Sequence, residues 1–238
     1  MKNKLFIVST PIGNFDDITL RALKILKEVD IIVCEEFKPA RRLLSFYGIA
    51  KQLISVNEHN ESESTFEVID EIKSGKTVAL ISDAGTPLFS DPGNTLVEQA
   101  ILSGIEIVPV PGASSLLAAL VGTGYHFEQF YYYGWLSPKK EIRQIQLKKL
   151  KAVNEVIIIL ETPYRLVALL TDIKKTFGSN QNIVVAYKLT QKEEKFYRGN
   201  VDSVLNKITN DKLKGEFVLI IEKHFLENNS KYIHKKKI

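Results

Sequence analysis

The amino-acid sequence predicts an α/β fold of two domains, with a doubly wound parallel sheet first and a mixed sheet second. In the first half, short β-branched and aliphatic runs alternate regularly with segments whose apolar residues recur at helical spacing. In the second half this alternation becomes irregular, and the last strand-like segments resemble antiparallel strands. Regular alternation is typical of a parallel sheet that helices cover on both faces, whereas the later pattern indicates a mixed sheet.

The first domain is expected over residues 1–115. Its predicted strands lie at 5–9, 30–34, 53–56, 77–81 and 105–110, and its helices at 19–28, 39–46, 60–74 and 94–103. Leu20, Leu23 and Leu26 share one face of the first helix. The third helix ends at Ser74-Gly75, a typical helix C-terminal signal. These elements predict a parallel sheet.

The second domain is expected over residues 116–225, and residues 226–238 form a basic tail. An apolar helix at 116–121 precedes the break Gly122-Thr123-Gly124. An aromatic strand at 130–133, a basic helix at 139–151, an apolar strand at 156–160 and a helix at 164–174 follow. Three further strands are predicted near 183–187, 195–197 and 216–221. The last two resemble antiparallel pieces, which predicts a mixed sheet.

The composition is that of an ordinary globular protein, with 45% hydrophobic and 25% charged residues in 238. No apolar run approaches the length that a bilayer span needs, and the start shows no signal-peptide pattern. Cys34, the single cysteine, excludes disulfides within the chain and is expected as a buried structural thiol. We therefore expect a cytoplasmic protein without a membrane association. The spacing of four histidines and one cysteine indicates no metal site.

The net charge of +4 is unevenly distributed. Basic residues gather in the tail and in the helix at 139–151, where they are interleaved with apolar residues. The outer face of this helix is expected to present Lys139, Lys140, Arg143, Lys148 and Lys149. Such a face is either merely solvated or contacts the phosphates of a nucleic acid.

Three loops that follow predicted strands share one chemistry: residues 10–17, 82–93 and 111–115. Each contains Gly and Pro, and none supplies the Lys or Arg expected around a polyphosphate. The chain also lacks a phosphate-loop motif and a complete dinucleotide-binding motif. In open α/β sheets, ligands bind at the carboxyl ends of the strands. A neutral-to-acidic crevice of this kind fits the amine, ribose and sulfonium of S-adenosylmethionine better than ATP, although the loops could also be ordinary β–α connections.

Several runs in these loops resemble those of the tetrapyrrole methylase superfamily. They are Thr10-Pro11-Ile12-Gly13-Asn14, Ser82-Asp83-Ala84-Gly85-Thr86-Pro87, Asp91-Pro92-Gly93 and Pro111-Gly112-Ala113-Ser114-Ser115. Further matches are Glu58-His59-Asn60-Glu61, Gly134-Trp135-Leu136-Ser137-Pro138, Glu161-Thr162-Pro163-Tyr164-Arg165 and Gly215-Glu216-Phe217-Val218-Leu219-Ile220. Within the superfamily the chain most resembles bacterial methyltransferases that modify a cytidine ribose 2′-hydroxyl in small-subunit ribosomal RNA.

The sequence departs from that branch at two places. The branch usually reads Glu-Asp-Thr-Arg after the second strand, where this chain has Glu35-Glu36-Phe37-Lys38. Longer members carry a helical extension after the final strand, which is expected to be missing here. Both departures predict a divergent, shortened relative.

The resemblance implies a tetrapyrrole-methylase-like fold with S-adenosylmethionine in the cleft between the domains. It implies donor contacts at Pro11, Gly13, Asp83, Gly85, Thr86, Ser114, Ser115, Thr162, Leu189 and Glu216. It also implies a homodimer, and ribosomal RNA or the small ribosomal subunit as partner. Two other functions remain open at this point, namely a carbon methyltransferase of precorrin-type tetrapyrroles and a non-catalytic donor-binding module that regulates a partner.

Methyl transfer to a hydroxyl needs in-line placement, a dry pocket and a base or polarising group. Glu36, His59 and Arg165 are the candidates for catalysis, because each follows a predicted strand at the expected sheet edge. For Glu36 and His59, a helix cap or a salt bridge in a loop is the alternative. Arg165 lies near a helix start, where a cation gains nothing from the helix dipole, which favours contact with a substrate phosphate or a carboxylate.

Overall fold

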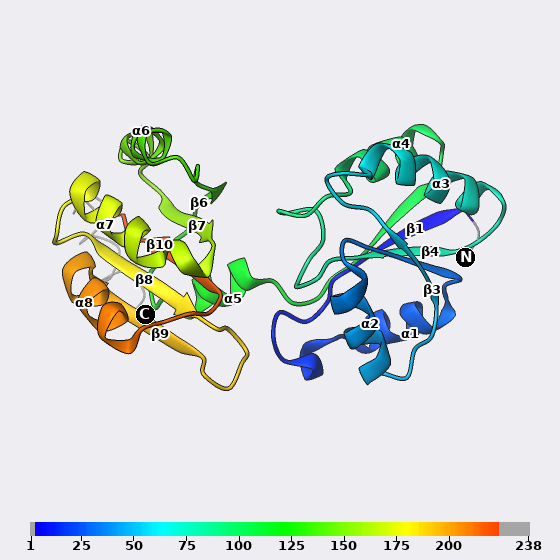
Figure 1. Ribbon diagram of the computed structural model, residues 1–238, viewed down its shortest axis with the longest axis horizontal. Helices are drawn as coiled ribbons and strands as arrows, with labels where there is room; N and C mark the ends of the chain where they lie inside the picture. The colour runs from blue at the N-terminus through cyan, green and yellow to red at the C-terminus, as the bar shows by residue number, and fades with distance from the viewer. Residues whose placement is uncertain (1–2, 224–238) are drawn as a thin grey trace, which may run out of the picture. The chain divides into compact units, whose positions relative to one another are not determined.

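The computed structural model describes residues 3–223, which divide into two compact units at Ser115 and Leu116 (Figure 1). The predicted basic tail lies outside the described residues. No helix within residues 3–223 combines the length and the apolar character that crossing a bilayer requires.

The first unit contains a five-stranded sheet with the order β3-β2-β4-β1-β5. The strands are β1 (Lys4–Val8), β2 (Ile31–Cys34), β3 (Gln52–Ser55), β4 (Val78–Ile81) and β5 (Glu106–Val110). Every neighbouring pair is parallel. The predicted parallel sheet is therefore confirmed, and β3 is one of its two edge strands.

Helices cover both faces of this sheet (Figure 1). The helices α1 (Leu20–Glu28) and α2 (Phe37–Phe46) pack on one face, and α3 (Glu61–Lys73) and α4 (Asn94–Leu102) on the other. The short 3-10 helix η1 (Phe15–Asp17) precedes α1, whose first turn is capped by Thr19. The helix α2 begins two residues before the predicted start, since Pro39 is tolerated in a first turn.

The second unit begins within α5, which spans Ser115–Val121, and contains a five-stranded sheet with the order β6-β7-β10-β8-β9. The strands are β6 (Phe130–Trp135), β7 (Val156–Glu161), β8 (Asn182–Tyr187), β9 (Lys195–Asn200) and β10 (Phe217–Ile221). β6 and β7 are parallel, whereas the other neighbours are antiparallel. The predicted mixed sheet is confirmed.

Three longer helices contribute to the core of this unit: α6 (Lys140–Leu150), α7 (Leu166–Phe177) and α8 (Val201–Asp211). The 3-10 helix η2 (Pro163–Arg165) leads into α7. The helix α8 was not predicted from the sequence. Its signals were Asn200, which caps the helix by accepting a hydrogen bond from the Ser203 N–H at 2.9 Å, and the buried Val201, Val204 and Ile208 at helical spacing.

Cys34 lies at the end of β2 with no exposed surface, as predicted for a structural thiol. Burial, reinforced by the nearby Asp83 carboxylate, raises the pKa of the thiol to about 12. The thiol is therefore protonated at neutral pH, which makes it a poor nucleophile.

Candidate functional site

The three loops singled out in the sequence meet at the carboxyl edge of the adjacent strands β4, β1 and β5. The Thr10 N–H donates to the Gly85 carbonyl oxygen at 2.8 Å. The Thr10 hydroxyl accepts from the Gly85 N–H at 3.1 Å and lies 3.1 Å from the Ser82 carbonyl oxygen. Thr10 is 1% exposed, so these bonds are shielded from water. They fix the first loop to the second.

A chain of hydroxyl groups connects the second loop to the third. The Thr86 hydroxyl donates to the Ala113 carbonyl oxygen at 3.1 Å, and the Ser9 hydroxyl lies 3.0 Å from the same Thr86 oxygen. Because the one hydroxyl proton of Thr86 is used by Ala113, Ser9 donates to Thr86. The Ser9 N–H also donates to the Val110 carbonyl oxygen at 3.1 Å. All three loops are thus joined by direct hydrogen bonds.

Two glycines allow this close approach. Gly85 has a φ of +89°, and a Cβ atom there would lie 3.0 Å from Ile12 Cγ2. A Cβ atom at Gly112 would lie 2.8 Å from Ser9 Cβ, closer than real Cβ atoms come. Glycine at both positions is therefore a packing requirement of the loops themselves.

Carboxylates gather beside these loops, where β2 and β4 end. Desolvation, together with the Asp83 charge, raises the pKa of Asp91 to about 6. Desolvation also raises the pKa of Glu35 and, although that residue is exposed, of Asp83. The backbone N–H of Glu36 opposes this shift by donating to the Asp83 carboxylate. The edge is acidic, and a bound cation would relieve the repulsion among these groups.

Of the donor contacts predicted in the first unit, all lie on the joined loops. Pro11 and Gly85 are buried, Thr86, Ser114 and Ser115 are half-buried, and Gly13 and Asp83 are exposed. The buried and half-buried residues shape the edge, and the exposed ones are accessible to a ligand.

Two of the three predicted catalytic residues also lie in the first unit. Glu36 is exposed at the N-cap position of α2, but its side chain makes no capping hydrogen bond. His59 is exposed in the turn between β3 and α3, where its N–H donates to Asn57 Oδ1 at 3.0 Å. Their catalytic roles stay predictions.

The donor contacts predicted in the second unit lie together at one edge of its sheet. Thr162 follows the end of β7, Leu189 lies just beyond β8, and Glu216 precedes β10. These three places are adjacent because Phe217 pairs with both Glu161 and Tyr187, and the Lys188 N–H donates to the Glu216 carbonyl oxygen at 2.8 Å. Leu189 is 7% exposed, and desolvation raises the pKa of the Glu216 carboxyl although the residue is exposed.

Arg165, the third predicted catalytic residue, pairs with a carboxylate of its own chain. Glu161 is 1% exposed and its Oε1 accepts from Arg165 Nε at 2.7 Å, from Arg165 Nη2, and from the Thr162 N–H at 2.7 Å. Arg165 Nη2 also lies 3.3 Å from the Leu136 carbonyl oxygen. Within residues 3–223, Glu161 Oε2 and Arg165 Nη1 are buried without a hydrogen-bond partner. Such atoms are rare and indicate a water or ligand that completes the site.

The expected cationic face of α6 is confirmed only in part. Lys139, Lys140, Lys148 and Lys149 are exposed. The placement of Arg143 on this face was wrong, because its side chain is 8% exposed and forms an ion pair with Asp172. The helix turns Ile142 and Ile145 toward solvent instead, with 44% and 55% of their surface exposed.

The residues present fit S-adenosylmethionine. The loops offer carbonyl oxygens, hydroxyls and carboxylates without a Lys or Arg, which suits a ligand with a sulfonium, an amine and ribose hydroxyls. In the first unit, the acidic groups with raised pKa values suit a cation. In the second unit, taken by itself, the orphaned Glu161 Oε2 suits an N–H donor. Across residues 3–223, no group of three or more His, Cys, Asp or Glu is placed to hold a metal ion.

Two features near these sites were not predicted from the sequence. Glu61 Oε1 caps α4 by accepting from the Gly93 and Thr95 N–H groups at 2.9 and 3.0 Å. The capping residue comes from another helix, so no local pattern shows it. A pocket between α2 and β3 was also missed, although the basic residues Arg41 and Lys51 that line it are visible in the sequence.

Comparison with known proteins agrees with this geometry. The model of the family described as tetrapyrrole (corrin/porphyrin) methylases matches residues 4–205. The chain therefore belongs to this family of S-adenosylmethionine-dependent methyltransferases, and the resemblance noted in the sequence is confirmed.

Several relatives carry the name ribosomal RNA small subunit methyltransferase I. The protein of Synechocystis sp. is 40% identical over 91% of this chain and 78% of its own length. The protein of Bacillus subtilis is 39% identical over 92% and 74%, and that of Thermotoga maritima is 41% identical over 92% and 97%.

Solved structures show the same fold at much lower identity. A cobalt-precorrin-4 methyltransferase of cobalamin biosynthesis has a TM-score of 0.71 at 17% identity, covering 92% of this chain and 94% of its own. The uroporphyrin-III C-methyltransferase of Thermus thermophilus, solved with S-adenosylhomocysteine, has a TM-score of 0.65 at 16% identity, covering 92% and 96%. These likenesses confirm the fold class.

Proposed function

We propose that this protein transfers a methyl group from S-adenosylmethionine to the ribose 2′-hydroxyl of a cytidine in small-subunit ribosomal RNA. The observation that supports it best is the identity of about 40% with relatives named ribosomal RNA small subunit methyltransferase I, over nine tenths of the chain. The hydrogen-bonded, acidic loop edge of the first unit supports the choice of donor.

The donor, when bound, supplies an electrophilic methyl group. In this proposal the joined loops bind and orient it through Asp83, Gly85 and Thr86, with Pro11 and Gly13 on the first loop and Ser114 and Ser115 on the third. In the second unit, Thr162, Leu189 and Glu216 are the proposed contacts. Hydrogen bonds between protein atoms join the loops to one another and hold these residues in place around the donor.

The hydroxyl that accepts the methyl group must lose its proton. Glu36 and His59 are the proposed groups that receive it, since both are exposed and follow strands β2 and β3. The proposed role of Arg165 is to position Glu161 and Thr162, because its guanidinium is engaged with the Glu161 carboxylate. In this proposal Arg165 therefore acts through Glu161 and Thr162 and does not contact the reacting ribose directly.

A tetrapyrrole substrate is the weaker candidate. The structures named for tetrapyrrole methylation are 16–18% identical to this chain and support the fold alone. The exposed lysines of α6 suit the extended row of phosphates of an RNA backbone. A donor-binding module without catalysis would bind S-adenosylmethionine but transfer no methyl group.

The deciding experiment is transfer of labelled methyl groups from S-adenosylmethionine to small ribosomal subunits, and to free ribosomal RNA, from a strain that lacks this protein. We expect label in RNA and one phosphodiester bond that becomes resistant to alkali, because a methylated 2′-oxygen cannot attack the neighbouring phosphate. Label on a base would contradict the ribose assignment. Donor binding without transfer to either substrate would favour the non-catalytic module.

The proposed assembly is a homodimer in the cytoplasm, without a metal requirement or membrane association. Sedimentation equilibrium at micromolar concentration is expected to give twice the mass of the chain. A monomer under these conditions would remove the dimer from the proposal. Unchanged methyl transfer after treatment with a chelator is the expected result for an enzyme that needs no metal.

A further inference from the structure

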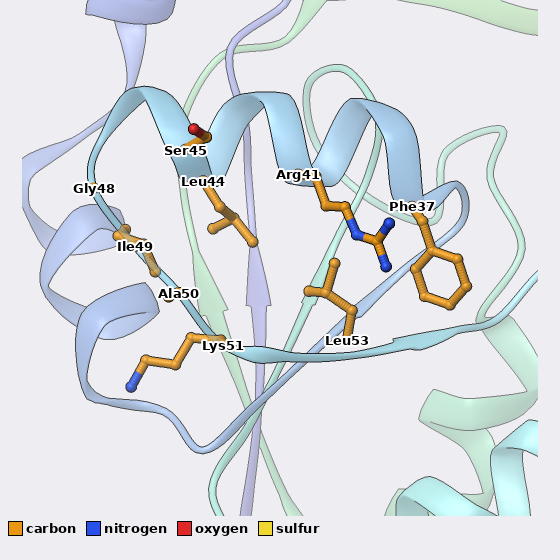
Figure 2. Close-up of a pocket in the computed structure, with 9 residues that line it drawn as sticks. All are labelled: Phe37, Arg41, Leu44, Ser45, Gly48, Ile49, Ala50, Lys51 and Leu53. Atoms are coloured by element: carbon orange, nitrogen blue, oxygen red, sulfur yellow. The ribbon is translucent and has the colours of Figure 1, made fainter.

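A pocket opens on the first unit between α2 and the edge strand β3, with a volume of about 630 Å³. This size is in the range of small-ligand sites. Its walls come from α2, the turn that follows it and the start of β3. Figure 2 shows Arg41 and Phe37 toward one end and Lys51 toward the other, with Leu44 and Leu53 between them.

The pocket combines an apolar floor with cationic ends. Leu44 and Ile49 are buried, at 3% and 7% exposed, and form the floor. Phe37 is 41% exposed, and the Arg41 guanidinium carbon lies 5.3 Å from the centroid of its ring. The guanidinium thus lies over one face of the ring, and nucleobases stack on exposed aromatic rings and on guanidinium planes alike.

The cations at the two ends of the pocket have no carboxylate within ion-pair distance among the described residues. Among residues 3–223, no ion pair involves Arg41 or Lys51. Asp30 is the carboxylate that interacts with Lys51 electrostatically, but it accepts hydrogen bonds from the Thr77 N–H at 2.7 Å and the Thr77 hydroxyl at 2.8 Å. Asp30 offsets part of the positive charge of Lys51 from beyond ion-pair distance, so the charge at this end of the pocket is reduced but not paired.

From this combination we infer that the pocket binds one unpaired nucleotide of a single-stranded RNA, with the base on Phe37 and flanking phosphates on Arg41 and Lys51. Single-stranded RNA is recognised through stacked, unpaired bases and through its phosphates, and the pocket offers both. The inference rests on the proposed RNA substrate. It adds a binding site on the α2–β3 side of the first unit, lined by none of the residues proposed to hold the donor.

The test compares binding of a short, unstructured ribo-oligonucleotide to the wild type and to two variants at several salt concentrations. The Arg41→Gln/Lys51→Gln variant should bind more weakly, and its salt dependence should be flatter by about 0.7 in slope for each phosphate that is no longer neutralised. Phe37→Leu should weaken binding by about tenfold with an unchanged slope, because it removes stacking but no charge.

The matched control is Arg21→Gln/Lys73→Gln, which removes two exposed cations of α1 and α3 outside the pocket. The control should bind RNA like the wild type, and every variant should keep the wild-type affinity for S-adenosylmethionine, which reports correct folding. Equal RNA affinity and slope in the wild type and the pocket variants would overturn the inference. An equal loss in the control, no RNA binding by the wild type, or equally strong competition by free cytidine monophosphate would also overturn it.

Methyl transfer to ribosomal subunits, measured with the same proteins, separates this inference from the proposed function. Pocket-dependent RNA binding without any methyl transfer would leave the pocket assignment standing and refute the enzyme assignment. Methyl transfer together with RNA binding that does not depend on the pocket would support the enzyme assignment and refute the pocket assignment.

Discussion

Arg143 and Asp172 form a buried ion pair that joins α6 to α7. Arg143 Nε and Nη2 donate to Asp172 Oδ2 at 2.9 and 2.8 Å, and the side chains are only 8% and 4% exposed. Arg143 Nη1 donates to the carbonyl oxygens of Ser137 and Pro138 at 3.3 and 3.1 Å. The guanidinium therefore also fixes the chain that enters α6.

Removing one partner of this pair should destabilise the protein strongly. Arg143→Gln leaves the Asp172 carboxylate buried without its cation, and we expect a loss of about 3–5 kcal/mol in the free energy of unfolding. Urea denaturation measures it. The control is Lys174→Gln, which breaks an exposed ion pair with Asp202 and should cost about 0–1 kcal/mol. Similar losses of unfolding free energy in Arg143→Gln and Lys174→Gln would contradict the buried placement of the Arg143–Asp172 pair.

The exposed lysines of α6 should contribute to RNA affinity. Replacing Lys139 and Lys140 with Gln should weaken RNA binding and flatten its salt dependence by about 0.7 in slope for each phosphate that these lysines neutralise. A filter-binding series over salt concentration measures both quantities. The control replaces Lys192 and Lys207, which are exposed elsewhere in the same unit. If both double variants bind RNA like the wild type, the lysines of α6 are simply solvated.

Gly85 should tolerate no side chain without losing donor affinity. Gly85→Ala places a Cβ atom 3.0 Å from Ile12 Cγ2 at a φ of +89°, and we expect it to cost about 1–2 kcal/mol of stability. Calorimetry should also show weaker binding of S-adenosylmethionine. The control Gly75→Ala shares the positive φ of +100° but meets no atom within 4 Å. Equal affinity of both variants for S-adenosylmethionine would contradict the proposed contact between this loop and the donor.

Donor affinity should rise with pH as Asp91 ionises. Its pKa of about 6 lies above the unfolded value of 3.8, so the folded state holds a proton between these values that the unfolded chain has released. The contribution of Asp91 to stability therefore falls as pH rises through this window. A cationic ligand favours the ionised carboxylate, so its affinity changes in the opposite direction.

Calorimetry near pH 6, in two buffers that differ in ionisation enthalpy, should show proton release when S-adenosylmethionine binds. Asp91→Asn should reduce this release, while Glu98→Gln, an exposed carboxylate change on α4, should not. Some pH dependence should remain, because the pKa values of Asp83 and Glu35 are raised as well. Identical proton release by the wild type and Asp91→Asn would refute this account.

Glu61 should stabilise the start of α4 from a distance in the sequence. The N-cap residue of α4 is Gly93, which has no side chain to cap the helix, and Glu61 accepts from the Gly93 and Thr95 N–H groups instead. Glu61→Ala should cost about 1–2 kcal/mol in urea denaturation. The control is Glu63→Ala, which changes an exposed residue of α3, the helix that also carries Glu61. It should reduce the free energy of unfolding far less.

The sequence predicted those parts of the fold that neighbouring residues in the chain determine. Apolar periodicity and turn residues located every strand of both sheets and all the longer helices except α8. The three loops could be identified because residues such as Gly85 and Pro111 sit at strand ends, and a parallel topology brings such ends together.

What the sequence could not predict depends on which side chains meet in the folded chain, and periodicity does not show this. Arg143 looked like a surface cation because the buried Asp172 that attracts it lies 29 residues away. The Arg165 side chain could be expected near a carboxylate, but not that Glu161, four residues earlier, would be that group. The pocket beside β3 depends on how a turn folds back between a helix and an edge strand, which periodicity does not encode.

Side-chain hydrogen bonds from other parts of the first unit hold the loop between β4 and α4 at both of its ends. Thr10 holds it at Gly85, and Glu61 holds it at Gly93. Between these points Pro87 and Pro92 have restricted backbone torsions, so few degrees of freedom remain to be lost. Ordering a flexible residue costs about 1–2 kcal/mol of conformational entropy. A ligand that binds this loop therefore loses less of its interaction energy to ordering the backbone.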